Sequence, residues 1–159
     1  MCLTYKHEYK AESIDGWKAF AYKDGILKSY FSKYHPEYEP NVVNKHISLD
    51  FSPGFYIFKN EASAYNIIFN KSFWARWTDV NIVLPVTLYD VTHKGLMIQD
   101  DDEQCMPMKY ESFIGKRIVV HYNEENVKRF KKMVQKHYID KMQYSVDPQH
   151  LEIMKELIS

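Results

Sequence analysis

The sequence lacks the features that mark several large classes of protein. It contains two cysteines, Cys2 and Cys105, which lie far apart and form no Cys-x-x-Cys pair. That usage suits a reducing cytosol and offers no framework for a metal site. The chain also has no apolar run of about 18 residues and no hydrophobic segment of a signal peptide. We therefore expect a cytoplasmic protein without a membrane span.

An excess of either charge is also missing, because 21 basic residues balance 21 acidic ones among the 159. With no net charge, the field of the whole protein favours neither binding to nucleic acid nor imitation of it. Any electrostatic binding must come from a local patch. The length fits one domain, which buries roughly two thirds of the surface of its unfolded chain.

Aromatic residues are abundant, with 13 Tyr, 9 Phe and 3 Trp. Tyrosine at this level is typical of a small core whose rings keep their hydroxyl groups near solvent. It can also indicate a recognition surface, because Tyr provides a large contact area at a low entropic cost. Composition leaves both interpretations open.

The first part of the chain predicts a β-hairpin followed by a long loop. Residues 16–22 alternate as a strand, Asp24-Gly25 is a strong turn signal, and residues 26–31 should return as the second strand. Residues 1–15 show no clear period. Residues 32–53 hold three prolines and few periodic apolar residues, so they are predicted to be a loop, and loops of that length are often functional.

A helix between two strands is predicted next. Residues 55–58 form an aromatic strand, and Asn60 is a good N-cap for a helix that runs from Glu61 to about Lys71. Residues 81–91 form the following strand. Pro85 within it lacks a backbone donor, which indicates an edge strand or a bulge.

Three short strands are predicted after a turn at Gly95. They cover residues 96–99, 106–113 and 116–122, and Gly115 separates the last two. The acidic segment Asp100–Glu103 is either a solvated hairpin tip or a site for a divalent cation, although it lacks the ligand spacing of a calcium loop.

The end of the chain predicts two helices. Asn123 caps the first, and its apolar side contains residues at helical spacing, namely Val127, Phe130, Val134 and Tyr138. Asp147-Pro148 opens the second. We therefore predict a single α+β domain over residues 1–159, with a mostly antiparallel, twisted sheet of about five or six strands, one internal helix and two C-terminal helices. Residues 1–122 form its sheet-rich core and residues 123–159 its helical part.

Two groups of residues are candidates for binding a partner. Opposite the apolar side of the first C-terminal helix lie four cations, Lys128, Arg129, Lys132 and Lys136, three of them aligned four residues apart. Like charges at this spacing repel, so an acidic protein surface or a phosphate backbone would stabilise them; the alternative is a solvated helix face. The second group is Trp74, Arg76 and Trp77, which form either a ligand wall or part of the core.

Neighbouring residues suggest no metal site and no catalytic group. The seven histidines show no His-x-x-x-His or His-Glu-x-x-His pattern, and His121 is predicted to be a half-buried strand residue. No nucleophile lies close in sequence to a histidine that could act as its base. These observations favour a protein that is not an enzyme and that has no cofactor.

Much of the chain up to about Lys116 resembles small accessory proteins of bacteriophages and gut-bacterial mobile elements. The resemblance rests on Met1-Cys2-Leu3, Gly16-Trp17-Lys18-Ala19-Phe20, Ser29-Tyr30-Phe31, Tyr38-Glu39-Pro40, Gly54 to Phe58 with Glu61-Ala62, and Val83-Leu84-Pro85-Val86. Those proteins carry a Gly-Phe-His-x-Phe core, in which Tyr56 replaces the histidine here. The resemblance implies a single-domain protein that binds and disables host machinery, including defence systems.

A narrower segment is similar to ADP-ribosyltransferases of the poly-ADP-ribose polymerase type. The shared features are the strand Gly54 to Phe58, the helix residues Ser63-Ala64-Tyr65 and the apolar strand after them. This resemblance implies that Tyr56 stacks on the nicotinamide of NAD and that Glu103 or Glu111 is the catalytic acid. The family's NAD-orienting histidine has no counterpart, because the first strand reads Trp17-Lys18-Ala19-Phe20.

Together these features lead to one primary hypothesis and two alternatives. The primary hypothesis is a viral accessory protein in the bacterial cytosol that binds and inhibits a host protein or ribonucleoprotein complex, for example a nuclease-based defence system such as CRISPR. The first alternative is an enzyme that binds NAD or a nucleotide. The second is direct binding of nucleic acid, which predicts an affinity that falls steeply with added salt.

Overall fold

The computed structural model describes residues 4–23, 26–29, 37–46, 54–68, 80–101 and 106–135. Within these ranges the chain forms one six-stranded antiparallel sheet and two α-helices, which confirms the predicted α+β class. The elements are β1 (Thr4–Lys23), β2 (Ile26–Ser29), β3 (Val43–Lys45), β4 (Phe55–Phe58), α1 (Glu61–Ile68), β5 (Val80–Asp101), β6 (Met106–Val120) and α3 (Glu124–Met133). The predicted helix after Asp147 lies outside the described residues.

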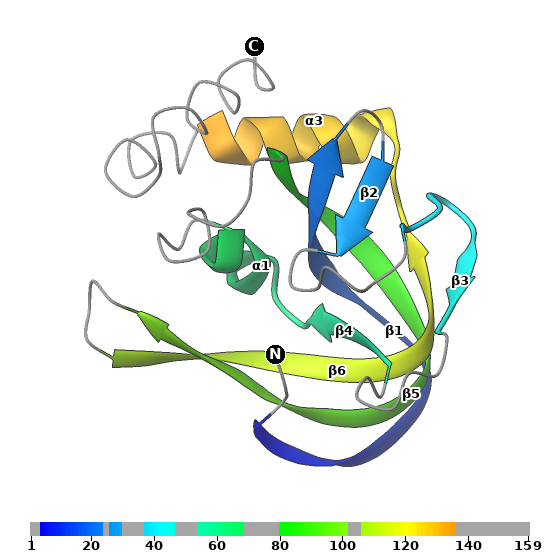
Figure 1. Ribbon diagram of the computed structural model, residues 1–159, viewed down its shortest axis with the longest axis vertical. Coiled ribbons are helices and arrows are strands. Elements are labelled where there is room, and N and C mark those ends of the chain that lie inside the picture. The colour runs from blue at the N-terminus through cyan, green and yellow to red at the C-terminus, as the bar shows by residue number, and fades with distance from the viewer. Residues whose placement is uncertain are drawn as a thin grey trace.

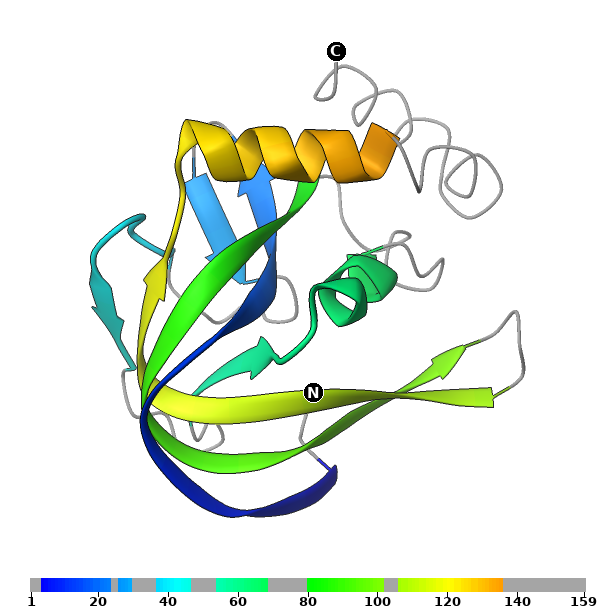
Figure 2. The same ribbon diagram turned by 180° about the vertical axis from the view of Figure 1, so that it is seen from behind.

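Three long strands carry the sheet. β5 pairs with β1 on one side and with β6 on the other. The short strand β2 pairs with β1, and the short strand β3 pairs with β6. β4 pairs with β6 along its whole length and meets β1 at one pair, Trp17 and Phe58. The long strands curve strongly, so that their two halves run in different directions around β4 and α1 (Figure 1). α3 lies across the end of the sheet where β1 and β2 form their hairpin, as the reverse view also shows (Figure 2).

The strand β1 is much longer than the sequence predicts. Residues 1–15 show no period, yet β1 begins at Thr4. Its register against β5 shifts between Thr4 and His7 and again between Glu8 and Ala11. Each shift is a bulge or irregularity, which interrupts the alternation of side chains and bends the strand. The missing period therefore reflects irregular pairing and not the absence of a strand.

The strand predicted at residues 81–91 lies between β1 and β6, but its pairing with β6 begins only at Val86, so the predicted edge at Pro85 is confirmed locally and not for the whole strand. The position of Pro85 explains how the strand tolerates it. Its carbonyl accepts a hydrogen bond of 3.1 Å from the amide of His121, which follows the last residue of β6. In an antiparallel strand the N–H and C=O of one residue point to the same neighbour. The backbone nitrogen of Pro85, which has no hydrogen to donate, therefore faces the point where β6 ends.

Neither of the two predicted glycine breaks interrupts a strand. β5 passes through Gly95, which pairs with Ser112, and β6 runs through Gly115 as one strand. Gly115 has a packing role, because a Cβ there would lie 2.7 Å from the carbonyl oxygen of Tyr89. Close approach of two backbones requires glycine at this position.

The other local predictions are confirmed wholly or in part where the structure describes them. The hairpin of β1 and β2 has Lys23 opposite Ile26, which leaves the predicted Asp24-Gly25 between them. β5 and β6 form a hairpin at the predicted acidic segment, but Asp100 and Asp101 still belong to β5, and the rest of the segment lies outside the described residues. The predicted loop at residues 32–53 is partly wrong, since it contains β3 and a bridge from Tyr38 to Leu27.

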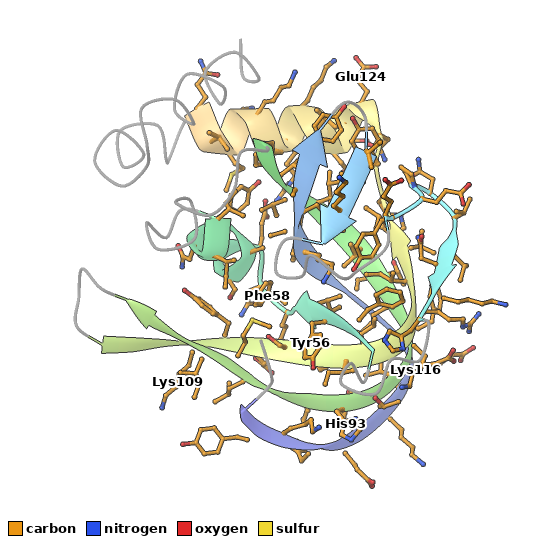
Figure 3. All side chains as sticks on the ribbon, in the orientation of Figure 1. Tyr56, Phe58, His93, Lys109, Lys116 and Glu124 are labelled. Atoms are coloured by element: carbon orange, nitrogen blue, oxygen red, sulfur yellow. The ribbon has the colours of Figure 1, made fainter. Side chains whose placement is uncertain are left out.

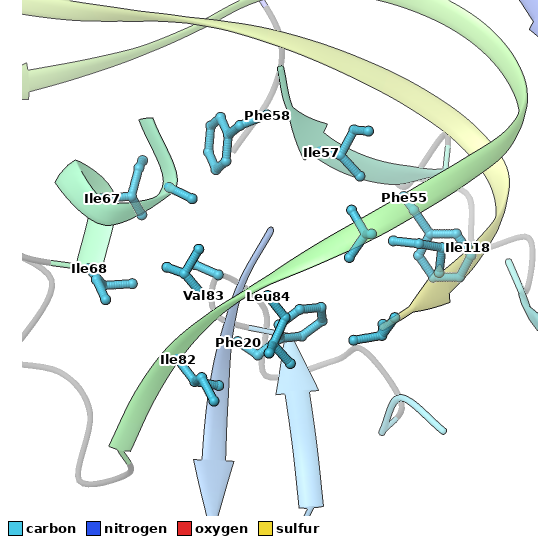
Figure 4. Packing of buried hydrophobic residues seen from close by; sticks show 14 of the residues in the cluster. Phe20, Phe55, Ile57, Phe58, Ile67, Ile68, Ile82, Val83, Leu84 and Ile118 are labelled. Atoms are coloured by element: carbon cyan, nitrogen blue, oxygen red, sulfur yellow. The ribbon is translucent and has the colours of Figure 1, made fainter. Parts of the chain in front are cut away.

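The core fills the space between the curved sheet and the two helices. Side chains of α1, β4, β5 and β6 meet in one cluster (Figure 4). α3 joins this cluster through its predicted apolar side: Phe130 and Val134 are buried, and Val127 is half-buried. The ring of Phe130 stacks on Tyr65 of α1 with 6.0 Å between centroids. Each fully buried side chain of this size contributes about 1.5 to 3 kcal/mol, so the packed side fixes how α3 presents its other side.

Candidate functional site

The first turn of α3 is built as the sequence predicts. Asn123 is the N-cap, and its side-chain oxygen accepts a hydrogen bond of 2.9 Å from the amide of Asn126. Glu124 and Glu125 lie in the first turn, where negative charge favours the helix dipole. In Figure 3, Glu124 lies at the end of the helix where the chain arrives from β6.

The four predicted cations of this helix have different surroundings. Lys128 forms an ion pair of 3.1 Å with Glu124, and the two side chains are 73% and 83% exposed. Lys132 is exposed, and Lys136 lies outside the described residues. An exposed pair of this kind contributes only a few tenths of a kcal/mol, so an acidic partner could replace Glu124 at little cost.

Arg129 makes an intramolecular tether. Its guanidinium binds both carboxylate oxygens of Glu61, at 3.2 and 2.7 Å, and lies 5.4 Å from the ring centre of Trp17. The hydrogen bond to Glu61 raises the pKa of Arg129 above its usual value. Arg129 thereby connects α3 to the start of α1 and to β1.

The residues of the ADP-ribosyltransferase resemblance are only partly described. Tyr56 is half-buried on β4 and pairs with Ile114 of β6. The carboxylate of Glu111 forms an ion pair with the ammonium of Lys59, at 3.4 Å. Opposed residues share a face of the sheet and successive residues alternate, so Tyr56 and Glu111 point to opposite faces. Glu103 lies outside the described residues, as do the predicted partner-binding residues Trp74, Arg76 and Trp77.

A buried lysine occupies the junction of β1 and β4. Lys18 is 8% exposed, and its ammonium donates a hydrogen bond of 2.6 Å to the carbonyl of Tyr56. It lies 6.0 Å from the ring centre of Tyr38. Burial lowers the pKa of Lys18 to about 8. In the part of the chain that the structure describes, no carboxylate lies within ion-pair distance of it.

One face of the three long strands, beside α3, is partly exposed in the part of the chain that the structure describes. Directly opposed residues form rows across β1, β5 and β6, and none of their side chains on this face is buried. By contrast Ala19 and Val83, the next row toward α3, are 2% and 1% exposed. We name this partly exposed surface the open face; it consists of Ser13, Asp15, Trp17, Pro85, Thr87, Tyr89, Arg117, Val119 and His121.

A hydrogen-bonded chain of three side chains crosses the middle of the open face. The hydroxyl of Thr87 donates to Oδ1 of Asp15 at 2.7 Å and lies 2.8 Å from Nε2 of His121. The hydroxyl has one proton, which makes the hydrogen bond to the carboxylate. The hydrogen bond between Thr87 and His121 must therefore be donated by Nε2 of His121. In the neutral ring Nδ1 is then the acceptor. The amide of Asn126 holds the backbone of this histidine from α3, at 2.9 Å.

Two contacts between an arginine and an aromatic ring lie on either side of these three hydrogen-bonded side chains. Arg117 pairs with Asp90 at 2.6 Å and lies 5.4 Å from the ring centre of Tyr89. The hydrogen bond from Arg117 lowers the pKa of Asp90 below its usual value. On the other side, the guanidinium of Arg129 lies over the ring of Trp17. Both arginines are thus neutralised by carboxylates within the protein.

The open face could not be assembled from local sequence. Asp15 and Thr87 are separated by 72 positions, and Thr87 and His121 by 34. The prediction of His121 as a half-buried residue is confirmed, although it lies just after β6 and not within it. No local signal in the sequence marks Ser13 and Asp15, because residues 1–15 show no evident period.

Comparison with known proteins adds no assignment: no protein-family model, no curated protein and no solved structure matches this chain. Among the residues that the structure describes, no three His, Cys, Asp or Glu side chains are grouped so that they could hold a metal ion. No helix in the same part of the chain combines the length and apolar character needed to cross a membrane.

Proposed function

We propose that this chain is a binding protein that recognises a partner protein through the open face, with the exposed side of α3 as a neighbouring contact. The resemblance to phage accessory proteins suggests that the partner is a host protein, and inhibition of a defence complex is the hypothesis that follows from it. The observation that supports the proposal best is a partly exposed face, with aromatic residues and an arginine, on the three strands that form the centre of the sheet.

The composition of the open face resembles that of binding hot spots. Trp, Tyr and Arg are the residues most enriched where protein interfaces gain their binding energy. Here Trp17 and Tyr89 are half-exposed and held by neighbouring strands and by stacked guanidinium groups. A rigid face of this kind loses little conformational entropy on binding.

The lysines of α3 extend this surface. Lys128 and Lys132 are exposed on the helix that borders the open face, and Lys136 belongs to the same predicted stripe. If they contact an acidic region of the partner, reversal of all three charges should weaken complex formation and leave the fold intact. Co-purification of the triple variant at the wild-type level would remove the stripe from the proposed interface.

Site-specific photo-cross-linking tests the open face directly. A photoreactive residue at Ser13, on the open face, should give discrete protein adducts in bacterial lysate. The same residue at Lys109, an exposed position on the distant part of β6, should not (Figure 3). Tyr89→Ala should remove the adducts formed from position 13. Adducts that form equally from both positions, or that survive Tyr89→Ala, would contradict the proposal.

A further inference from the structure

We infer that the partner segment bound by the open face presents a basic side chain, arginine or lysine, to Asp15. This inference rests on the proposed binding function and adds the chemistry of the ligand. The open face contains one acidic residue, Asp15, and one arginine, Arg117; Arg117 is paired with Asp90, whereas the described residues do not balance the charge of Asp15.

The charge balance of the open face is the first argument. Arg117 is paired with Asp90, and Arg129, which covers Trp17, is paired with Glu61. Asp15 is exposed and has one hydrogen bond, from Thr87. No cation within the described ranges lies at ion-pair distance from it. The surface therefore presents one net negative charge among neutral pairs.

The hydrogen-bonding groups point to the same ligand. The Thr87 hydroxyl occupies Oδ1 of Asp15, and nothing in the described part of the chain donates to Oδ2. His121 uses Nε2 for Thr87, and whenever its ring is neutral Nδ1 is a second acceptor. The centre of the open face thus offers acceptors, and a guanidinium or ammonium group brings five or three donors with a positive charge.

The rings on either side favour a cation as well. Trp17 lies two residues from Asp15 on the same face of β1, and Tyr89 lies two residues from Thr87 on β5. Both rings already contact guanidinium groups of this chain, with 5.4 Å to each ring centre, which shows that aromatic rings at this place attract such groups. Aromatic rings beside a carboxylate increase the attraction for a cation as water is excluded. An acidic ligand would instead be repelled by Asp15.

Nuclear magnetic resonance of the full-length, isotope-labelled protein tests the inference with defined probes. The first probe is the capped tripeptide acetyl-Gly-Arg-Gly-amide, and the second is its Glu counterpart. The Arg peptide should shift the amide signals of Asp15, Thr87 and Val119, and the Glu peptide should not. Asp15→Asn should weaken binding of the Arg peptide at least fivefold. Glu12→Gln removes another exposed carboxylate of β1 and should leave binding unchanged.

Several outcomes would overturn the inference. Shifts of equal size with both peptides, or equal loss in Asp15→Asn and Glu12→Gln, would show that Asp15 does not select a cation. Saturation of the same signals by magnesium chloride at a lower concentration than the Arg peptide would indicate a metal site. Dimerisation that depends on Asp15 would identify a second copy of the chain as the ligand. Adducts from position 13 without any response to the Arg peptide would refute this inference alone and leave the proposed function standing.

Discussion

Replacing Lys18 by Met tests how the core is held together where β1 meets β4. The ammonium group is buried, and its hydrogen bond of 2.6 Å satisfies the Tyr56 carbonyl. Burial lowers the pKa of Lys18 from 10.5 to about 8. This difference corresponds to roughly 3 kcal/mol of the free energy of unfolding, because a tenfold change in a proton equilibrium is worth about 1.4 kcal/mol.

The sign of the effect follows from which state holds the proton. Between about pH 8 and about pH 10.5 the unfolded chain binds a proton at Lys18 that the folded protein has released. Stability therefore rises with pH across this window. Below about pH 8 both states are protonated, and the folded protein bears the full cost of a buried charge.

We expect the wild type to gain about 2 kcal/mol of stability relative to Lys18→Met between about pH 7 and about pH 9.5. Met fills a similar volume without a charge, and loss of the hydrogen bond to Tyr56 costs about 1 to 3 kcal/mol at every pH. Urea unfolding followed by tryptophan fluorescence measures this difference. Lys28→Met, on the exposed side of β2, is the matched control and should show the same pH dependence as the wild type.

A difference between wild type and Lys18→Met that stays constant over this range would refute the reasoning. It would mean that the Lys18 amine reaches solvent in the folded protein, or that a carboxylate compensates its charge. The control variant distinguishes this result from the titration of other lysines and tyrosines, which affects all three proteins equally.

Three further substitutions test how the site is held. Asn123→Ala should lower the free energy of unfolding by about 1 kcal/mol in urea, because the α3 cap is lost. Gly115→Ala should cost more than about 2 kcal/mol in the same assay, since its Cβ would meet the Tyr89 carbonyl. A double-mutant cycle of Arg129→Met and Glu61→Gln should give a coupling of about 1 kcal/mol, and no coupling would show that the tether is solvent-separated.

The features that sequence reasoning found correctly are those decided by neighbouring residues. The cap of α3 depends on Asn123 and on the acidic residues that follow it, and α1 begins at Glu61, directly after the predicted cap residue Asn60. The two-residue turn at Asp24-Gly25 likewise determines its hairpin locally. Where the prediction failed, as at Gly95 and Gly115, the glycine makes no turn: Gly95 lies within regular pairing of β5 and β6, and Gly115 lies beside the register shift between Val91 and His93, which β6 passes as one strand.

The open face depends on strand register, which no short segment reveals, but the core nevertheless fixes it. Asp15 lies opposite Thr87, between Val86 and Leu88, whose side chains point to the other face and are 1% and 0% exposed. A slip of one residue would place Asp15 opposite one of these core residues and expose the buried set to solvent. The apolar residues that stabilise the fold therefore also determine which polar residues meet on its surface. Only substitutions on the open face itself should therefore break the hydrogen bonds among Asp15, Thr87 and His121 without lowering the free energy of unfolding.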